Sequence, residues 1–255
     1  MSRARTSWSG WLGSAAVFCG FILLWSIASQ AGWISRVFLP TPHATLASLR
    51  EGLDSGELWG FTVATIGRML EGWLLASLAG IALGALIGVS AAARSYLQPT
   101  LEFVRPLPAS ALLPLAISLF GLNPGTVMFV VAFGAMWPVL LATVHGFAAV
   151  EPRLAEVSRC LQLSRPAFVL KVGLPNALPD ILAGMRLSMT VSLIVAVVGE
   201  MIASQPGLGQ AILLAARAFR ASELFAGIVL LGLIGLASNA LLSLVERKML
   251  KWQLP

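Results

Sequence analysis

The sequence predicts an all-α, polytopic membrane protein with about six transmembrane helices. Hydrophobic residues make up 58% of the 255 residues and charged residues only 11%, whereas soluble domains contain about 25% charged residues. The apolar residues form unbroken runs of about 16–22 residues, the length that a helix needs to cross the roughly 30 Å hydrocarbon core of a bilayer. Strands of an outer-membrane barrel would instead alternate in polarity.

Five of the expected spans are strong and one is weak. The weak span, residues 107–122, is interrupted by Pro108 and Pro114, and we expect a short cytoplasmic connection over residues 91–106 before it. The strong spans are residues 11–28, 74–89, 127–144, 181–202 and 225–245. We expect the first run to remain as a transmembrane helix, because it is longer than the apolar region of a secretory signal.

The distribution of basic residues predicts that both termini lie in the cytoplasm. With that orientation, eleven Lys and Arg residues fall in cytoplasmic segments and five outside, a bias that follows the positive-inside rule. The cytoplasmic ones are Arg3, Arg5, Arg94, Arg105, Arg153, Arg159, Arg165, Lys171, Arg247, Lys248 and Lys251. The net charge of +6 therefore reflects membrane topology, and we expect no nucleic-acid partner.

The expected organisation is a first helix with its outer connection over residues 1–57, followed by a core over residues 58–250. In the second span, small residues recur every four positions and so form one face of the helix. Such a face allows a neighbouring helix backbone to approach closely, and we interpret it as a packing surface. Its members are Gly72, Ala76, Gly80, Gly84 and Gly88.

The cytoplasmic loop over residues 147–179 is the most informative stretch. Seven of the 28 charged residues lie between residues 151 and 180. Apolar residues at helical spacing predict a short amphipathic helix over residues 154–163. A second short helix is expected to begin at Pro166 and to end at Leu174-Pro175. The acidic residues of the loop oppose binding to anionic lipid, so its apolar face is expected to meet a protein partner.

This loop resembles the cytoplasmic signature of the permease subunits of bacterial ATP-binding-cassette importers. That signature opens with Glu-Ala-Ala, has Gly six residues after the Glu, and ends with Leu-Pro twelve residues after the Gly. Here Glu156-Val157-Ser158 stands at the opening and Leu174-Pro175 at the close. Gln162 replaces the glycine; because glycine adopts backbone conformations that are costly for other residues, either the turn differs or Gln162 accepts the strain.

Further motifs resemble the nitrate, sulfonate and taurine branch of that family, and the end of the chain resembles the alkanesulfonate permeases. They are Phe38-Leu-Pro-Thr-Pro42, the stretch Arg105-Pro-Leu-Pro108, Gly199-Glu-Met201, Pro206-Gly-Leu-Gly209, Leu244-Val-Glu-Arg247 and Lys251-Trp252. The resemblance implies a non-catalytic subunit in the bacterial inner membrane. Its partners would be membrane lipid, a second copy of the chain, two ATPase subunits and an extracytoplasmic binding protein.

The resemblance also implies how the loop would act. Its first helix would be the coupling helix, seated in a groove of the ATPase, with Glu156 fixing its orientation. Val157, Ser158, Arg159, Gln162, Leu174 and Pro175 complete the expected contact segment. The three lysines follow no glycine, so the chain has no Gly-Lys-Ser/Thr phosphate loop. We therefore expect no cofactor or metal on this chain, with ATP and Mg²⁺ on the partner ATPase.

Polar residues within the spans are candidates for the translocation path, since such groups are costly at membrane depth. They are Ser188, Thr190, Ser192, Glu200 and Asn239. For the hydroxyl groups, bonds to their own helix are the favoured interpretation, and for Asn239 an interhelical bond is favoured over substrate binding. We also expect Arg186 to extend to the cytoplasmic surface and Arg68 to pair with Glu71.

Two other functions remain to be weighed against an importer subunit. A gradient-driven carrier working alone would need ionisable residues at the membrane midplane, and only Glu71 and Glu200 come near. An intramembrane enzyme would need more than His43 and His145, which have no metal-ligand or Ser-His spacing around them. The substrate stays open among a sulfonate, taurine, nitrate, bicarbonate and a small heterocycle.

Overall fold

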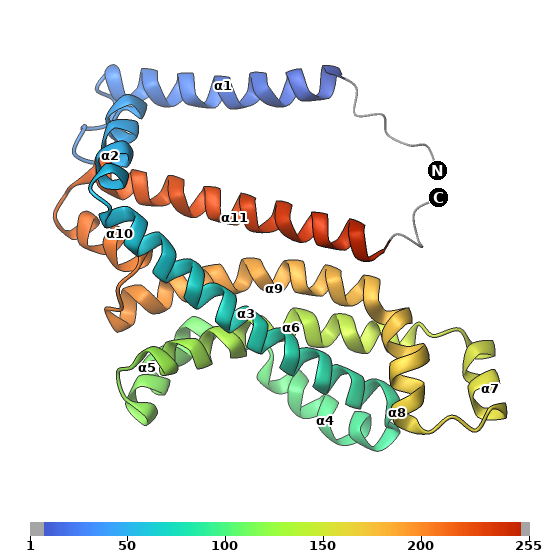
Figure 1. Cartoon of the computed structure of the whole chain (residues 1–255). Helices are drawn as coiled ribbons and strands as arrows, with labels where there is room; N and C mark the ends of the chain where they lie inside the picture. Colours follow the sequence, from blue (N-terminus) through green and yellow to red (C-terminus); the bar gives the residue numbers. More distant parts are fainter. Residues whose placement is uncertain (1–7, 251–255) are drawn as a thin grey trace. The chain divides into compact units, whose positions relative to one another are not determined.

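The computed structural model describes residues 8–250, and these form helices joined by short turns (Figure 1). Arg3, Arg5, Lys251 and Trp252 lie outside the described residues. The elements are α1 (Trp8–Gln30), α2 (Pro42–Asp54), α3 (Glu57–Val89), α4 (Ala91–Val104), α5 (Ala109–Phe120), α6 (Pro124–Ala148), α7 (Pro152–Cys160), α8 (Arg165–Phe168), a π-helical turn (Val169–Gly173), α9 (Leu174–Ala203), α10 (Leu208–Arg217) and α11 (Ala221–Met249).

The described residues divide into two compact units. The first contains the chain up to Gly60 together with Ala211–Leu230, and the second contains Phe61–Gln210 and the chain from Leu231 onward. In the first unit, the segment that joins α1 to α2 is fixed by two hydrogen bonds. The Trp25 indole donates to the carbonyl of Pro40 at 2.9 Å, and the Ser29 hydroxyl donates to that of Leu39 at 3.0 Å. The site and the cavity described below lie in the second unit.

Within residues 8–250, five helices are long and apolar enough to cross a membrane, and a bent pair supplies a sixth span if it is counted as one. The pair is α4 and α5, which meet at 94°. The short connection expected over residues 91–106 consists mostly of the helix α4. At 1.5 Å per residue, the 12 residues of α5 rise about 18 Å, which is too short to cross the bilayer without α4.

The glycine face of α3 lies directly against α6. A Cβ on Gly80 would lie 3.0 Å from backbone atoms of Met136 and Leu140, and a Cβ on Gly84 would overlap Thr143. Two turns before Gly80, Gly72 lies against Val131 of α6, and one turn after Gly84, Gly88 lies against Phe147 of α6. Ala76 of this face is fully buried. The small side chains therefore let two helix backbones approach along about four turns.

α9 packs along another face of α6, and Figure 1 shows the two helices running side by side. Gly146 of α6 meets Ala177 of α9 near one end, and Gly199 of α9 meets Val127 of α6 near the other. Between them, the Ser188 hydroxyl donates to the carbonyl of Ala135 at 2.6 Å. α6 is thus enclosed by α3 and α9 over almost its whole length.

Glu200 joins three helices through a fully buried carboxylate. Its Oε1 forms an ion pair with Arg68 of α3, and its Oε2 accepts hydrogen bonds from the Thr65 hydroxyl at 3.0 Å and from the backbone N–H of Gly209 at 2.8 Å. The Thr65 hydroxyl in turn accepts a hydrogen bond from the N–H of Leu208 at 2.9 Å. A negative charge is favourable there, because α10 begins at Leu208 and its first N–H groups have no partner within the helix.

Two glycines make room for this carboxylate. A Cβ on Gly207 would overlap the Glu200 carboxyl group, and a Cβ on Gly209 would overlap the carbonyl oxygen of Val197. The chain turns sharply between α9 and α10 at Ser204, which takes a left-handed conformation with a φ of 49°. The motif Pro206-Gly-Leu-Gly209 therefore allows the start of α10 to pack against Glu200.

The one ion pair expected from the sequence is wrong, and a second pair was not foreseen. Arg68 pairs with Glu200, 132 positions away, and not with Glu71 in the next turn of its own helix. The side chain of Arg186, which was expected to extend to the cytoplasmic surface, is partly exposed and pairs with Glu246 near the end of α11. Both pairs join helices that are distant in the sequence, which spacing along one helix cannot predict.

Replacing Glu200 with Ala should strongly destabilise the fold. The change would leave Arg68 without its counter-charge and the N–H of Gly209 without an acceptor, and removing one partner of a buried pair costs about 3–5 kcal/mol. The measurement is the melting temperature of the detergent-solubilised protein, followed by size-exclusion chromatography after heating. Arg50→Ala is the matched control, because the Arg50–Asp54 pair is exposed and such pairs contribute little. Equal melting temperatures for the two variants would contradict the structural role of Glu200.

Candidate functional site

The cytoplasmic loop folds as the short helix α7 followed by a tight turn. The predicted amphipathic helix over residues 154–163 is observed two residues earlier, as Pro152–Cys160. Its apolar side chains, Leu154, Val157 and Leu161, are 45%, 53% and 67% exposed. Ser158 is the buried residue of the helix, and its hydroxyl donates to the carbonyl of Leu154 at 2.7 Å. The helix therefore presents an apolar face that no described residue of the chain covers.

Gln162 takes the conformation that a glycine would take at the end of α7. Its φ is 51°, in the left-handed region. The N–H of Gln162 donates to the carbonyl of Arg159 at 2.9 Å, and that of Leu163 donates to the carbonyl of Ser158 at 3.0 Å. These two bonds define a Schellman motif with Gln162 at its left-handed position. Of the two alternatives open from the sequence, the turn is retained and Gln162 accepts the strain.

The second half of the loop leads without interruption into α9. α8 and the π-helical turn join α9 at Leu174, so Leu174-Pro175 opens that helix, and the expectation that it ends a separate helix is wrong. Where the loop enters α9, two contacts connect it to α6. The Asn176 side chain donates to the carbonyl of Gly146 at 3.0 Å, and Gly173 lies against the ring of Phe147.

The candidate path residues fall into different surroundings. Ser188 bonds across to α6, while the Ser192 hydroxyl bonds back to the carbonyl of Met189 in its own helix at 2.9 Å. Glu200 belongs to the buried cluster at the end of α9. Thr190 and Asn239 are exposed on the chain. The structure does not bring these five residues together into one site.

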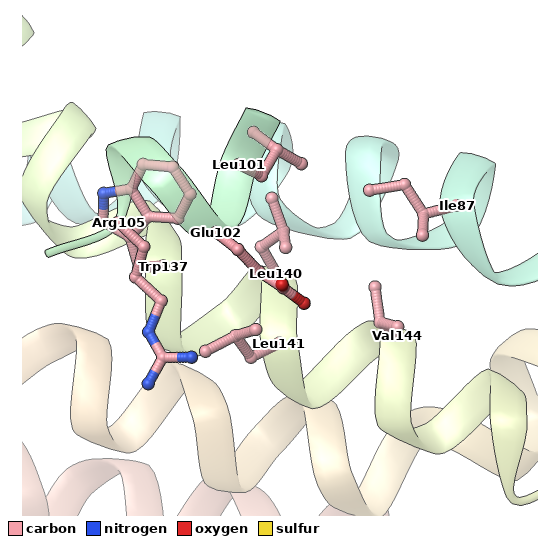
Figure 2. A pocket seen from close by; sticks show the side chains of 8 residues that line it. All are labelled: Ile87, Leu101, Glu102, Arg105, Trp137, Leu140, Leu141 and Val144. Atoms are coloured by element: carbon pink, nitrogen blue, oxygen red, sulfur yellow. The ribbon is translucent and has the colours of Figure 1, made fainter. Parts of the chain in front are cut away.

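A small cavity lies between α3, α4 and α6, and sequence reasoning missed it (Figure 2). It has a volume of about 50 Å³. Glu102 and Arg105 line it from the end of α4, and their side chains reach toward α6 (Figure 2). Trp137 lines it from α6, and its buried indole nitrogen has no hydrogen-bond partner. The remaining lining residues are apolar: Ile87, Leu101, Leu140, Leu141 and Val144.

Arg105 was assigned to a cytoplasmic segment because the charge count treated residues 91–106 as a connection. In the structure it caps the end of α4, where the chain bends toward α5. Pro108, which is extended and directly precedes α5, is the signal that could have located this break, since the residue before a proline is biased away from the helical conformation.

A family model described as "Binding-protein-dependent transport system inner membrane component" matches residues 76–251. The matched segment covers more than half of the chain. It includes the loop with α7, the residues that line the cavity, and Glu200 itself, but not Thr65 and Arg68, which precede it.

Curated relatives of similar length align with the chain. A Bacillus subtilis protein named for aliphatic sulfonates transport, SsuC, is 34% identical over 96% of this chain and 88% of its own. The nitrate import permease protein NrtB of Leptolyngbya laminosa is 34% identical over 77% of this chain and 70% of its own. The bicarbonate transport system permease protein CmpB of Synechococcus elongatus is 28% identical over 98% of this chain and 94% of its own.

Among solved structures, the MetNI methionine ABC transporter in an inward-facing conformation contains a chain with the same fold. The TM-score is 0.69 at 19% identity, over 76% of this chain and 96% of that chain. The family match, the relatives and the fold agree with the resemblance that the loop motif carries. The chain belongs to the binding-protein-dependent transport system inner membrane components, the non-catalytic permease subunits of ABC importers.

Proposed function

We propose that the chain forms the translocation path for a small oxyanion and couples it to ATP hydrolysis through the loop at residues 151–175. The relatives are named for aliphatic sulfonates, nitrate and bicarbonate. These solutes differ in their central atom, but all carry a negative charge spread over two or three oxygens. A path for that chemistry needs hydrogen-bond donors and a positive charge, and no metal.

The exposed apolar face of α7 is the observation that carries the coupling proposal. Leu154, Val157 and Leu161 are apolar side chains that are exposed on α7 and its C-cap. Exposing apolar surface to water is unfavourable, and a partner that covers these side chains would remove that cost. Glu156 and Arg159 are exposed beside them and supply charges that orient the contact. The partner is the ATPase subunit, which binds ATP and Mg²⁺, so that the chain itself needs neither.

The transmission of motion follows from how the loop is attached. Because α8 continues into α9 and Asn176 bonds to α6, a force on α7 reaches two packed helices at once. α6 and α9 interlock by small residues, so they move as one body with little room to slide. We propose that two such bodies, one from each copy in a homodimer, rock against each other when the ATPases close. An extracytoplasmic binding protein delivers the anion.

Replacing Glu156 with Ala should uncouple ATP hydrolysis from import. The change removes a charge that orients α7 on the ATPase and leaves the buried core untouched, so membrane insertion should stay normal. The measurement is import and ATPase activity of the complex in proteoliposomes, with at least a tenfold loss of import per ATP hydrolysed expected. Glu51→Ala, at an exposed glutamate of α2, is the control. Normal import together with normal ATPase binding in the Glu156 variant would refute the proposed role.

Replacing Gln162 with Gly should stabilise the α7 turn without changing coupling. A left-handed conformation costs a non-glycine residue about 1–2 kcal/mol, and glycine relieves that cost at the same φ. Hydrogen–deuterium exchange of residues 152–164 should therefore slow by roughly fivefold or more, as about 1 kcal/mol predicts. Gln162→Ala, which keeps the strain, should exchange as the wild type does. Faster exchange in the Gly variant would show that the Gln162 side chain stabilises the turn.

A further inference from the structure

We propose that Arg105, the indole N–H of Trp137 and the first turn of α5 form an anion subsite in the translocation path. This inference rests on the proposed function and deepens it, because it assigns residues that would hold the oxyanion within the membrane. The ligand class is a small oxyanion with two or three equivalent oxygens, such as a sulfonate head group or nitrate.

The position of Arg105 is the first observation. It shares the cavity with Trp137, which lies 13 residues after the start of α6 and 11 before its end. At 1.5 Å per residue, that is about 16–20 Å from either end of the helix, and the cavity extends from there toward Val144 and Ile87 near the ends of α6 and α3. Among residues 8–250, Arg105 makes no ion pair. At the centre of a bilayer an arginine costs about 2.5–3.5 kcal/mol, and a bound anion would offset whatever part of that cost Arg105 carries within the helix bundle.

Trp137 supplies the second observation. The residue is 8% exposed, and its indole nitrogen is one of the few buried side-chain polar atoms in the described chain that lack a partner. Buried polar groups are normally hydrogen-bonded, and an exception calls for an explanation. An indole nitrogen can only donate, so the ligand that satisfies it must be an acceptor.

The break between α4 and α5 supplies the third. α5 begins at Ala109 after Pro108, which gives no side-chain cap. Ala109 lies against Gly134, one helical turn before Trp137 on α6, so the first turn of α5 is close to the cavity. The free N–H groups and the positive end of a helix dipole favour an anion there. Broken helices near the midplane are also where transporters place their solute sites.

Size and charge limit what the subsite can hold. The volume of about 50 Å³ is several times the roughly 10–15 Å³ that one water molecule requires, so it accepts a small oxyanion head group but not a bulky solute. Glu102 lines the same cavity, and its carboxylate repels an anion. That repulsion keeps binding weak, which a path needs for release, and it predicts that Glu102→Gln strengthens binding.

The test uses the complete complex of permease, ATPase and binding protein in proteoliposomes, with ethanesulfonate, nitrate and bicarbonate as probes. For the anion that the wild type imports, Arg105→Gln should lower import per ATP hydrolysed about tenfold or more, as loss of a charged hydrogen bond predicts. Arg105→Lys should stay within about threefold, because the positive charge remains. Trp137→Phe should lower import less than Arg105→Gln does. Arg94→Gln is the control, since Arg94 lies on α4 but bonds to the carbonyl of Gly88.

A second measurement follows binding without transport. In the detergent-solubilised permease–ATPase complex, the probe anion at matched ionic strength with chloride should raise the melting temperature of the wild type, because a ligand stabilises the folded state that binds it. The shift should vanish in Arg105→Gln and grow in Glu102→Gln. Unchanged import and an unchanged shift in Arg105→Gln would overturn the subsite alone. Failure of the wild type to import any of the three anions would overturn the proposed substrate class and the subsite together.

Discussion

The close approach of three helix backbones at α6 is the constraint on which the rest of the structure depends. On one side the glycines of α3 leave no space for a Cβ, and on the other α9 interlocks through Gly146, Gly184 and Gly199. Lipid and apolar side chains are alike in polarity, so helices in a bilayer are held by such packing and by polar contacts rather than by the hydrophobic effect. A larger residue on these faces would separate the helices over several turns, and every site described above would lose its geometry.

The bundle of α3, α6 and α9 has a distinct structural feature at each of its two ends. At one end, α7 is connected to α9 through α8 and the π-helical turn. The start of α9 is bonded to α6, because the Asn176 side chain donates to the carbonyl of Gly146. At the other, Glu200 joins α3, α9 and α10 through a single buried carboxylate. The cavity with Arg105 and Trp137 lies between them, where the broken pair α4–α5 meets α6. In the proposed mechanism, a displacement at α7 would reach this break through the packed helices α6 and α9.

The sequence predicts the spans, the glycine face and the cytoplasmic loop, since each depends on local periodicity or composition. Gln162 shows the limit of that reasoning: the spacing identifies its position, but only the backbone shows that it accepts a left-handed φ. Arg68 with Glu200 and Arg186 with Glu246 are pairs between distant helices, and no periodicity reports them. Arg105 lies in a stretch that the sequence suggests is a plain connection, and only the structure shows that this stretch is the helix α4, which meets α5 at 94°.

The central claim is that α6, α9 and the α7 loop move as one body. Spin labels at Leu122, before α6, and at Arg165, at the start of α8, would measure this by double electron–electron resonance, with Cys19 and Cys160 replaced by Ser and the labelled chain diluted in unlabelled chain. The account predicts the same distance distribution within one chain in the resting complex and after ATP binding. A shift of about 5 Å, roughly one helical turn, would contradict it, because the loop would then move independently of the helices that it is proposed to drive.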